Sequence, residues 1–162
     1  MAPLTETYAD IDINDAYQIS QVLLALRLDA GETVIGKKIG ATSLAVQEML
    51  GVFQPDFGFL TDAMWARDGM ISTDRLIAPR AEAEIGFRLH KSLQGPGITG
   101  QDVLEATESV VACFEIVDSR IRDWKIKIED TVADNASCGV FVLSEEAISP
   151  SGLDLSSMKV IV

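Results

Sequence analysis

The sequence predicts an α+β fold with a small N-terminal α/β portion over residues 1–65 and a β core over residues 66–162. One long run with helical spacing of apolar residues occupies positions 13–26, whereas the later apolar runs are short and have the length of strands. A hydrophobic content of 48% and a mean hydropathy of +0.21 are typical of a chain that folds around a core. At 162 residues, one such core is large enough to fold unaided.

The composition argues against several functional classes. The 25 acidic and 13 basic residues give a net charge of −12, which opposes binding to a phosphate backbone. No apolar run approaches the roughly 20 residues that cross a bilayer, and the N-terminus lacks the basic and apolar pattern of a leader. We therefore expect a cytoplasmic protein with no nucleic-acid or membrane partner. Cys113 and Cys138 lack metal-site spacing and are interpreted as reduced core thiols.

The first helix is predicted from the periodic run, with Asp12 or Asn14 as its N-cap and Gly31 at its end. Residues 33–40 then form a short strand between glycines, and Ser43 caps a second helix over 44–50.

Lys38 lies inside this glycine-bracketed strand, on the face opposite Lys37. From the strand alone, Lys38 is either a surface charge or a side chain held for function. Residues 54–58 form a turn in which Pro55 fixes one dihedral angle, so Asp56 is expected in a constrained loop. Asp56 is either a turn former or a functional carboxylate.

Two carboxylates stand two residues apart in the run over residues 79–87. In a strand Glu82 and Glu84 share one face, because successive side chains alternate. Neighbouring carboxylates raise each other's pKa unless a cation lies between them, and hard divalent cations prefer such oxygen ligands. The alternative is a solvated strand face that keeps the sheet edge soluble.

The second half of the chain contains further elements. Thr99 is expected to cap a helix that ends near Ser109, and the strand over 110–117 carries one carboxylate, Glu115, whose burial would need a partner. The small, polar residues 131–139 predict a tightly packed loop. Strands are predicted at 140–143 and at 158–162.

Five ordered motifs together resemble the 2-hydroxypenta-2,4-dienoate hydratases of bacterial aromatic meta-cleavage pathways, which belong to the fumarylacetoacetate hydrolase superfamily. The motifs are GKKIG at 36–40, QPDFG at 54–58, EAE at 82–84, FEIVDSR at 114–120 and DTVADNASCG at 130–139. The resemblance runs from Ala2 to the end of the chain. It is more specific than any one motif.

The resemblance implies a mixed β-barrel or roll, a Mg²⁺ or Mn²⁺ ion on Glu82, Glu84 and Glu115, and an active site lined by Lys38 and Asp56. It also implies the hydration of a small 2-hydroxydienoate to 4-hydroxy-2-oxopentanoate. A homo-oligomer, in association with other enzymes of the meta-cleavage pathway, is the expected assembly.

Two alternatives accompany this reading. The 4-oxalocrotonate decarboxylases share the three glutamates and the VADNAS loop, but the segments at 55–58, 122–124 and 138–139 favour the hydratases. Family members also extend beyond both ends of this sequence, so we expect a truncated chain with C-terminal strands missing, poorly stable as a monomer and weak in turnover. The second alternative is therefore an inactive module that binds metal or forms an oligomer interface.

Overall fold

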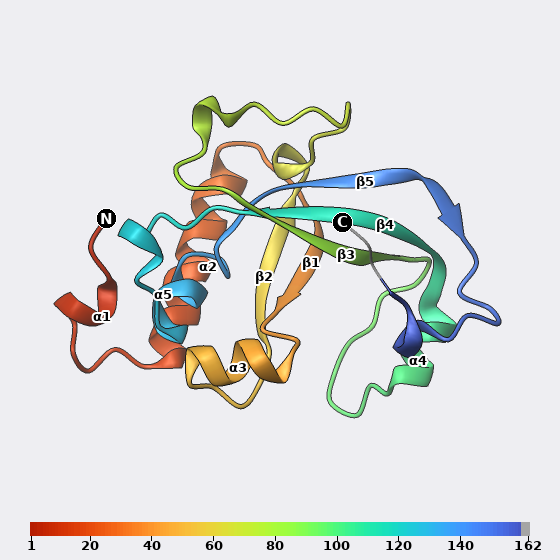
Figure 1. Ribbon diagram of the computed structural model, residues 1–162, viewed down its shortest axis with the longest axis horizontal. Helices are drawn as coiled ribbons and strands as arrows, with labels where there is room; N and C mark the ends of the chain where they lie inside the picture. The colour runs from red at the N-terminus through yellow and green to blue at the C-terminus, as the bar shows by residue number, and fades with distance from the viewer. Residues whose placement is uncertain (160–162) are drawn as a thin grey trace.

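The computed structural model describes residues 1–159, which form two small antiparallel sheets and a group of helices (Figure 1). The longer elements follow the chain in the order α1 (Leu4–Thr7), α2 (Ile13–Asp29), β1 (Val34–Gly40), α3 (Leu44–Leu50), β2 (Asp56–Thr61), β3 (Arg80–Leu89), α4 (Gly100–Ala106), β4 (Thr107–Val117), α5 (Ile128–Ala133) and β5 (Cys138–Ile148). Short 3₁₀ turns lie at η1 (Asp62–Met64), η2 (Thr73–Arg75), η3 (Arg122–Trp124) and η4 (Leu155–Ser157). The mixture of helices and small sheets agrees with the predicted α+β class.

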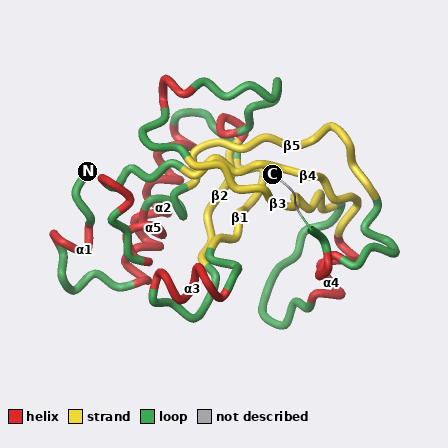
Figure 2. Tube along the Cα trace, viewed as in Figure 1, coloured by secondary structure: helices red, strands yellow, loops and turns green. Residues whose placement is uncertain are grey.

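The two sheets are separate in hydrogen bonding. Strands β1 and β2 form one antiparallel pair, and the other sheet has the order β3-β4-β5 (Figure 2). In the first pair Lys38 lies opposite Gly58, and in the second sheet Glu82 lies opposite Glu115. Side chains directly opposite each other in an antiparallel pair project from the same face. This register therefore puts Glu82 and Glu115 on one face of the sheet.

A shared apolar core joins the two sheets. Phe59 of β2 and Met64 of η1 pack with Cys138 and Phe141 of β5. A second cluster joins α2 to α5 through Ala16, Val132 and Ala133, and the two helices lie side by side in Figure 1. The packing holds β1 and β2 beneath the face of the larger sheet that carries the glutamates.

The predicted α2 begins and ends as its capping residues indicate. The Asp12 carboxylate accepts hydrogen bonds from the backbone amides of Asn14 (2.8 Å) and Asp15 (2.9 Å), so Asp12 is the N-cap rather than Asn14. The helix ends at Asp29, and Gly31 then adopts a φ of +94° that favours glycine. Ser43 caps α3 as predicted, through a bond from the Val46 amide.

Two predicted boundaries were wrong. Asp56 is the first residue of β2 rather than part of a loop, because it pairs with Gly40 at the end of β1. Helix α4 ends at Ala106 instead of near Ser109, since Thr107 already pairs with Leu89 and begins β4. In both cases pairing with a distant strand overrides the local turn or helix signal.

The segment expected to be a loop over 131–139 contains the second half of a helix. Helix α5 covers Ile128–Ala133, and β5 starts at Cys138 and runs to Ile148, well beyond the predicted 140–143. Helix formation here follows from burial, because residues 130–133 are all buried against α1 and α2.

The predicted strand over 158–162 falls mostly outside the described residues, and its first two positions, Met158 and Lys159, follow η4 without strand pairing. Within residues 1–159 no helix is long and apolar enough to cross a membrane.

Candidate metal centre and active site

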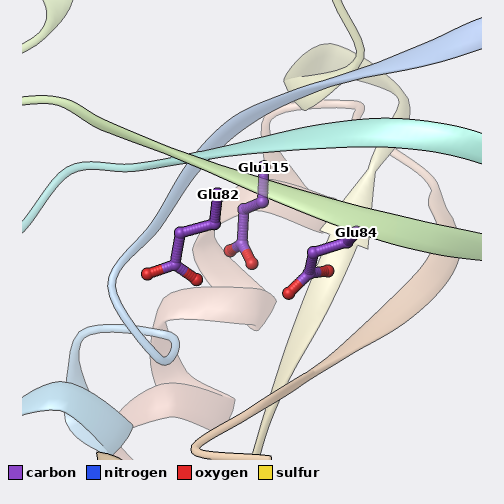
Figure 3. A group of neighbouring side chains, drawn as sticks. All are labelled: Glu82, Glu84 and Glu115. Atoms are coloured by element: carbon purple, nitrogen blue, oxygen red, sulfur yellow. The ribbon is translucent and has the colours of Figure 1, made fainter. Parts of the chain in front are cut away.

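Three carboxylates converge between the two sheets. Glu82 and Glu84 extend from β3 and Glu115 from β4, and all three point into the same space (Figure 3). One oxygen from each lies within 4.8 Å of the others. Strand alternation puts the first two on one face, and the pairing of Glu82 with Glu115 adds the third. The structure therefore brings together the three glutamates that the sequence singled out.

Glu115, the buried member of this triad, has few partners for its carboxylate oxygens within the protein. Glu115 is 3% exposed, and neither of its carboxylate oxygens accepts a hydrogen bond. The Lys38 ammonium lies 3.2 Å from Oε1 as an ion pair. Burial raises the pKa of Glu115, and the positive charge of Lys38 opposes this shift. Its oxygens retain the capacity to bind a further cation.

Burial and the neighbouring negative charges also shift the pKa of Glu84. Burial raises the pKa of Glu84 to about 7, with smaller contributions from the charges of Glu115 and Glu82, while Lys38 acts in the opposite direction. Near neutral pH this carboxyl group is therefore only partly ionised. Without a metal, the Glu84 carboxyl group is therefore partly protonated, which reduces the negative charge of the triad.

Lys38 bridges the triad and a fourth carboxylate. Its side chain is 8% exposed, on the face of β1 opposite the exposed Lys37, as the sequence predicted. Its ammonium donates to the carbonyl of Ala136 (3.0 Å) in addition to the ion pair with Glu115. Burial by itself lowers the pKa of Lys38, but the negative charges of Glu115 and Asp56 outweigh it, so that the pKa is raised. Lys38 is a cation in this arrangement.

Asp56 lies on the other side of Lys38. It is 4% exposed, and its Oδ1 has no hydrogen-bond partner. Burial raises the pKa of Asp56, and the charge of Lys38 partly offsets the rise. Gly40 makes this approach possible, because a Cβ atom at position 40 would collide with Asp56 Oδ1 and lie 3.1 Å from Lys38 Nζ. Both predicted active-site residues thus meet in one buried space.

The carbonyl that receives Lys38 comes from a strained loop. Asn135, Ala136 and Ser137 have φ values of 56°, 50° and 54°, a left-handed conformation that is costly for three consecutive residues with side chains. The Asn135 side chain accepts from the Phe59 amide (2.8 Å) and donates to its carbonyl (3.0 Å), which fastens the loop to β2. The sequence predicted a tightly packed loop here. It did not predict that a backbone carbonyl of this loop accepts a hydrogen bond from Lys38.

The charged segment after β4 stabilises this arrangement. The Asp118 carboxylate accepts from the amides of Ile77 and Ala78, which fixes the chain just before β3. Arg120 donates to Asp134 and to the carbonyl of Cys138, so it ties the end of α5 to the start of β5. These residues position the elements that carry the site and do not themselves line it.

The residues fit a hard divalent cation. Among the described residues, this triad is the one group of three carboxylate, thiol or imidazole side chains close enough to share a metal ion. All its ligand atoms are carboxylate oxygens, which suit Mg²⁺, Mn²⁺ and Ca²⁺ better than softer metals. Glu115 provides the independent observation: its two buried oxygens accept no hydrogen bond and have one ion-pair partner, Lys38, on Oε1, which leaves them able to bind a further cation.

A cavity lies next to Asp56. It has a volume of about 230 Å³ and lies between α2, α5 and the segment before β2, with Asp56 among its lining residues. A larger depression of about 830 Å³ lies between residues 7–11 and α2, and none of the predicted site residues lines it. Of these two cavities, the smaller one is therefore the one that a predicted active-site residue lines.

Comparison with curated proteins gives close relatives along the whole chain. A 2-hydroxypent-2,4-dienoate hydratase of Pseudomonas putida is 61% identical over 100% of this chain and 74% of the relative. A 2-hydroxyhexa-2,4-dienoate hydratase of Comamonas testosteroni is 60% identical over 97% of the chain and 61% of the relative. A 2-keto-4-pentenoate hydratase of Paraburkholderia xenovorans is 50% identical, and the chain spans 58% of its length. No family model matches the sequence.

Solved structures have a similar backbone fold over most of this chain. A 4-oxalocrotonate decarboxylase of Pseudomonas putida G7, complexed with magnesium and adipate, has a TM-score of 0.91 and 32% identity over 96% of this chain and 59% of that protein. The decarboxylase complexed with calcium and acetate gives a TM-score of 0.88 with 31% identity. Both structures contain a divalent cation.

Proposed function

Because the chain belongs to the 2-hydroxypenta-2,4-dienoate hydratase family, we propose that it is a hydro-lyase that converts 2-hydroxypenta-2,4-dienoate to 4-hydroxy-2-oxopentanoate in the meta-cleavage degradation of aromatic compounds. The observation that carries this proposal is the carboxylate triad with Lys38 at its edge. The chain spans between 58% and 74% of the length of these three relatives, so the assignment concerns the part of the site that lies in it.

Glu82, Glu84 and Glu115 would hold the metal ion, Mg²⁺ or Mn²⁺. When bound, such an ion would supply a Lewis acid that polarises the 2-oxygen of the substrate. The geometry supports this role because the three carboxylates point into one space, with Lys38 beside it. Magnesium in a structural neighbour at 32% identity also supports it.

Lys38 would bind the negative charge of the substrate. Its ammonium lies at the edge of the triad and is kept charged by two carboxylates, so it would stabilise the substrate carboxylate and the charge that develops on the 2-oxygen. The carbonyl of Ala136 fixes its orientation.

Asp56 would move a proton. Its raised pKa and its unpartnered oxygen suit a carboxyl group that carries a proton into the reaction. Protonation of the substrate at C5, with loss of the 2-hydroxyl proton, gives a 2-oxo-3-enoate, in which conjugation makes C4 electrophilic. Water then adds across C3 and C4, with the hydroxyl group on C4 and a proton on C3, and no covalent intermediate with the protein is needed. A second role of Asp56 is to orient Lys38.

Other features of the family remain proposals for this chain. They are a β-barrel or roll built on the two sheets, the division at residues 65 and 66, and a homo-oligomer associated with other meta-cleavage enzymes. The second candidate activity is 4-oxalocrotonate decarboxylation, which the structural neighbours favour. The non-enzymatic candidate is a metal-binding or interface module.

The test of the activity uses freshly generated 2-hydroxypenta-2,4-dienoate and the purified chain. We expect the absorbance of the dienoate to fall with Mg²⁺ and to remain constant after chelation of the metal, with 4-hydroxy-2-oxopentanoate as the product. Release of carbon dioxide from 4-oxalocrotonate, with no loss of the dienoate, would favour the decarboxylase. A folded chain that binds Mg²⁺ and turns over neither substrate would favour the module.

The pH dependence of stability should reverse when metal is added. A carboxyl group with a raised pKa binds its proton more tightly in the folded state, so the contribution of Glu84 to stability is greatest below about pH 4.5 and declines as pH rises through its folded pKa of about 7. Discounted for the partial exposure of Glu84, the decline is about 1–2 kcal/mol, or about 2–8 °C in melting temperature. Mg²⁺ needs ionised ligands, so its stabilisation should grow over the same range.

Thermal melts of the metal-free protein and of Glu84→Gln between pH 5 and pH 8 measure this effect. Between pH 5 and pH 8, the melting temperature of Glu84→Gln should fall less than that of the wild type, because glutamine does not titrate. A wild-type melting temperature that rises from pH 5 to pH 7 relative to that of Glu84→Gln would contradict the burial of this carboxyl group in the metal-free state.

A further inference from the structure

We propose that the cavity beside Asp56 is the subsite for the distal end of the dienoate, and that it selects substrates with an uncharged alkyl group at C5. The inference rests on the proposed function and extends it to substrate selection. It assigns a specificity-determining role to Val52, Tyr17 and Ile128, which line the cavity.

The position of the cavity follows from the order of groups along the site. Glu115 of the triad contacts Lys38 at 3.2 Å, and Lys38 and Asp56 both lie close to the same point above Gly40. Asp56 in turn lines the cavity. In the proposed binding mode, a substrate held at the triad through its carboxylate and 2-oxygen would extend past Lys38, with C5 next to Asp56. Any substituent at C5 enters the cavity.

The walls of the cavity are apolar and well supported. Ile13 and Tyr17 of α2 and Ile128 of α5 pack against the buried cluster that joins the two helices. The segment before β2 adds Val52 and Pro55, together with Gln54 and the 97% exposed Phe53. The volume of about 230 Å³ has room for several methylene groups, since a water molecule takes up about 30 Å³. Apolar walls bind alkyl groups through the area that they remove from water.

The charge of the cavity excludes a second carboxylate. Its described lining residues include Asp56 but no lysine, arginine or histidine. Burial, reinforced by the negative charge of Asp56, raises the pKa of Tyr17 although the Phe57 backbone amide opposes the shift, so Tyr17 is present as a neutral phenol. The distal carboxylate of a diacid such as 4-oxalocrotonate would approach Asp56 with no cation in the cavity to pair with it.

Binding of unreactive 2-oxo acids tests the subsite without requiring turnover. The probes are 2-oxopentanoate, 2-oxohexanoate and 2-oxoheptanoate, titrated calorimetrically into the chain with Mg²⁺ present. We expect affinity to rise about fourfold for each added methylene, or about 16-fold over the series. In contrast, 2-oxoadipate should bind at least about tenfold more weakly than 2-oxohexanoate, which has the same carbon chain.

A matched pair of variants locates the effect. Val52→Phe fills the cavity and should reduce the ratio of affinities for 2-oxoheptanoate and 2-oxopentanoate to about 1. Val22→Phe makes the same change at a 61% exposed position on α2 that lines only the larger depression, and it should keep the wild-type ratio.

The outcomes separate this inference from the proposed function. Equal affinities for the three monoacids, or tighter binding of 2-oxoadipate than of 2-oxohexanoate, would overturn the subsite while leaving the metal site in place. If no 2-oxo acid binds in the presence of Mg²⁺, both the proposed function and the subsite are wrong. The comparison with 2-oxoadipate needs only wild-type protein, so it decides the question even if Val52→Phe does not fold.

Discussion

Replacement of Glu115 by glutamine is expected to weaken Mg²⁺ binding by about 100-fold or more and to abolish metal-dependent turnover. Glutamine keeps the shape of the side chain but removes the charge of the most buried carboxylate of the triad. Loss of a hydrogen-bond partner behind a metal ligand already costs about 10–100-fold in affinity, so loss of a charged ligand should cost at least the upper end of that range. Calorimetric titration with Mg²⁺, with the melting temperature as a check of folding, measures the effect.

Two further variants make this result interpretable. Glu82→Gln removes the charge of the exposed carboxylate of the triad and should weaken metal binding while leaving the fold intact. Glu145→Gln makes the same chemical change at an exposed position of β5 outside the triad, and the Mg²⁺ affinity of this variant should equal that of the wild type. Wild-type affinity in both Glu115→Gln and Glu82→Gln would show that the metal binds elsewhere.

Replacement of Lys38 by methionine should lower kcat by about 10²–10⁴-fold, the range in which positioned acid–base and charged groups contribute. Methionine fills a similar volume without the ammonium that faces Glu115 and Asp56. Metal binding should persist, because Lys38 is not a ligand and its removal takes a positive charge away from Glu115. The expected signature is therefore loss of turnover with retained Mg²⁺ affinity.

The neighbouring lysine provides the control. Lys37→Met makes the same substitution one residue earlier, on the exposed face of β1, and should retain wild-type kcat. If Lys38→Met turns over substrate as fast as Lys37→Met, the catalytic role of Lys38 is wrong. If Lys38→Met also loses Mg²⁺ binding, Lys38 supports the metal site rather than the chemistry.

Alternation along single strands made much of the site predictable from sequence. It put Glu82 and Glu84 on one face and Lys38 opposite Lys37, and both arrangements are present in the structure. The lone carboxylate of Glu115 in an apolar strand likewise indicated a buried charge in need of a partner, and Lys38 is that partner. Each of these inferences depends on the local period of a strand, which is a property of a few consecutive residues.

Contacts between distant segments decided what the sequence could not show. The pairing of Glu82 with Glu115 depends on a register between strands 33 positions apart, and the lysine-binding carbonyl of Ala136 depends on the attachment of Asn135 to β2. No local pattern encodes either contact. The same holds for α5, whose helical residues 131–133 have a loop-like composition and are ordered by packing against α2. Tertiary contacts therefore overrode propensity at these positions.

The most direct test of a shared metal site is a crystal structure of the chain grown with Mn²⁺, with anomalous scattering recorded for the metal. The account predicts one anomalous peak between the carboxylates of Glu82, Glu84 and Glu115, on the side that faces Lys38. No peak should remain at that place in Glu115→Gln crystals. A peak at another position, or none in wild-type crystals under conditions where calorimetry shows binding, would contradict the account.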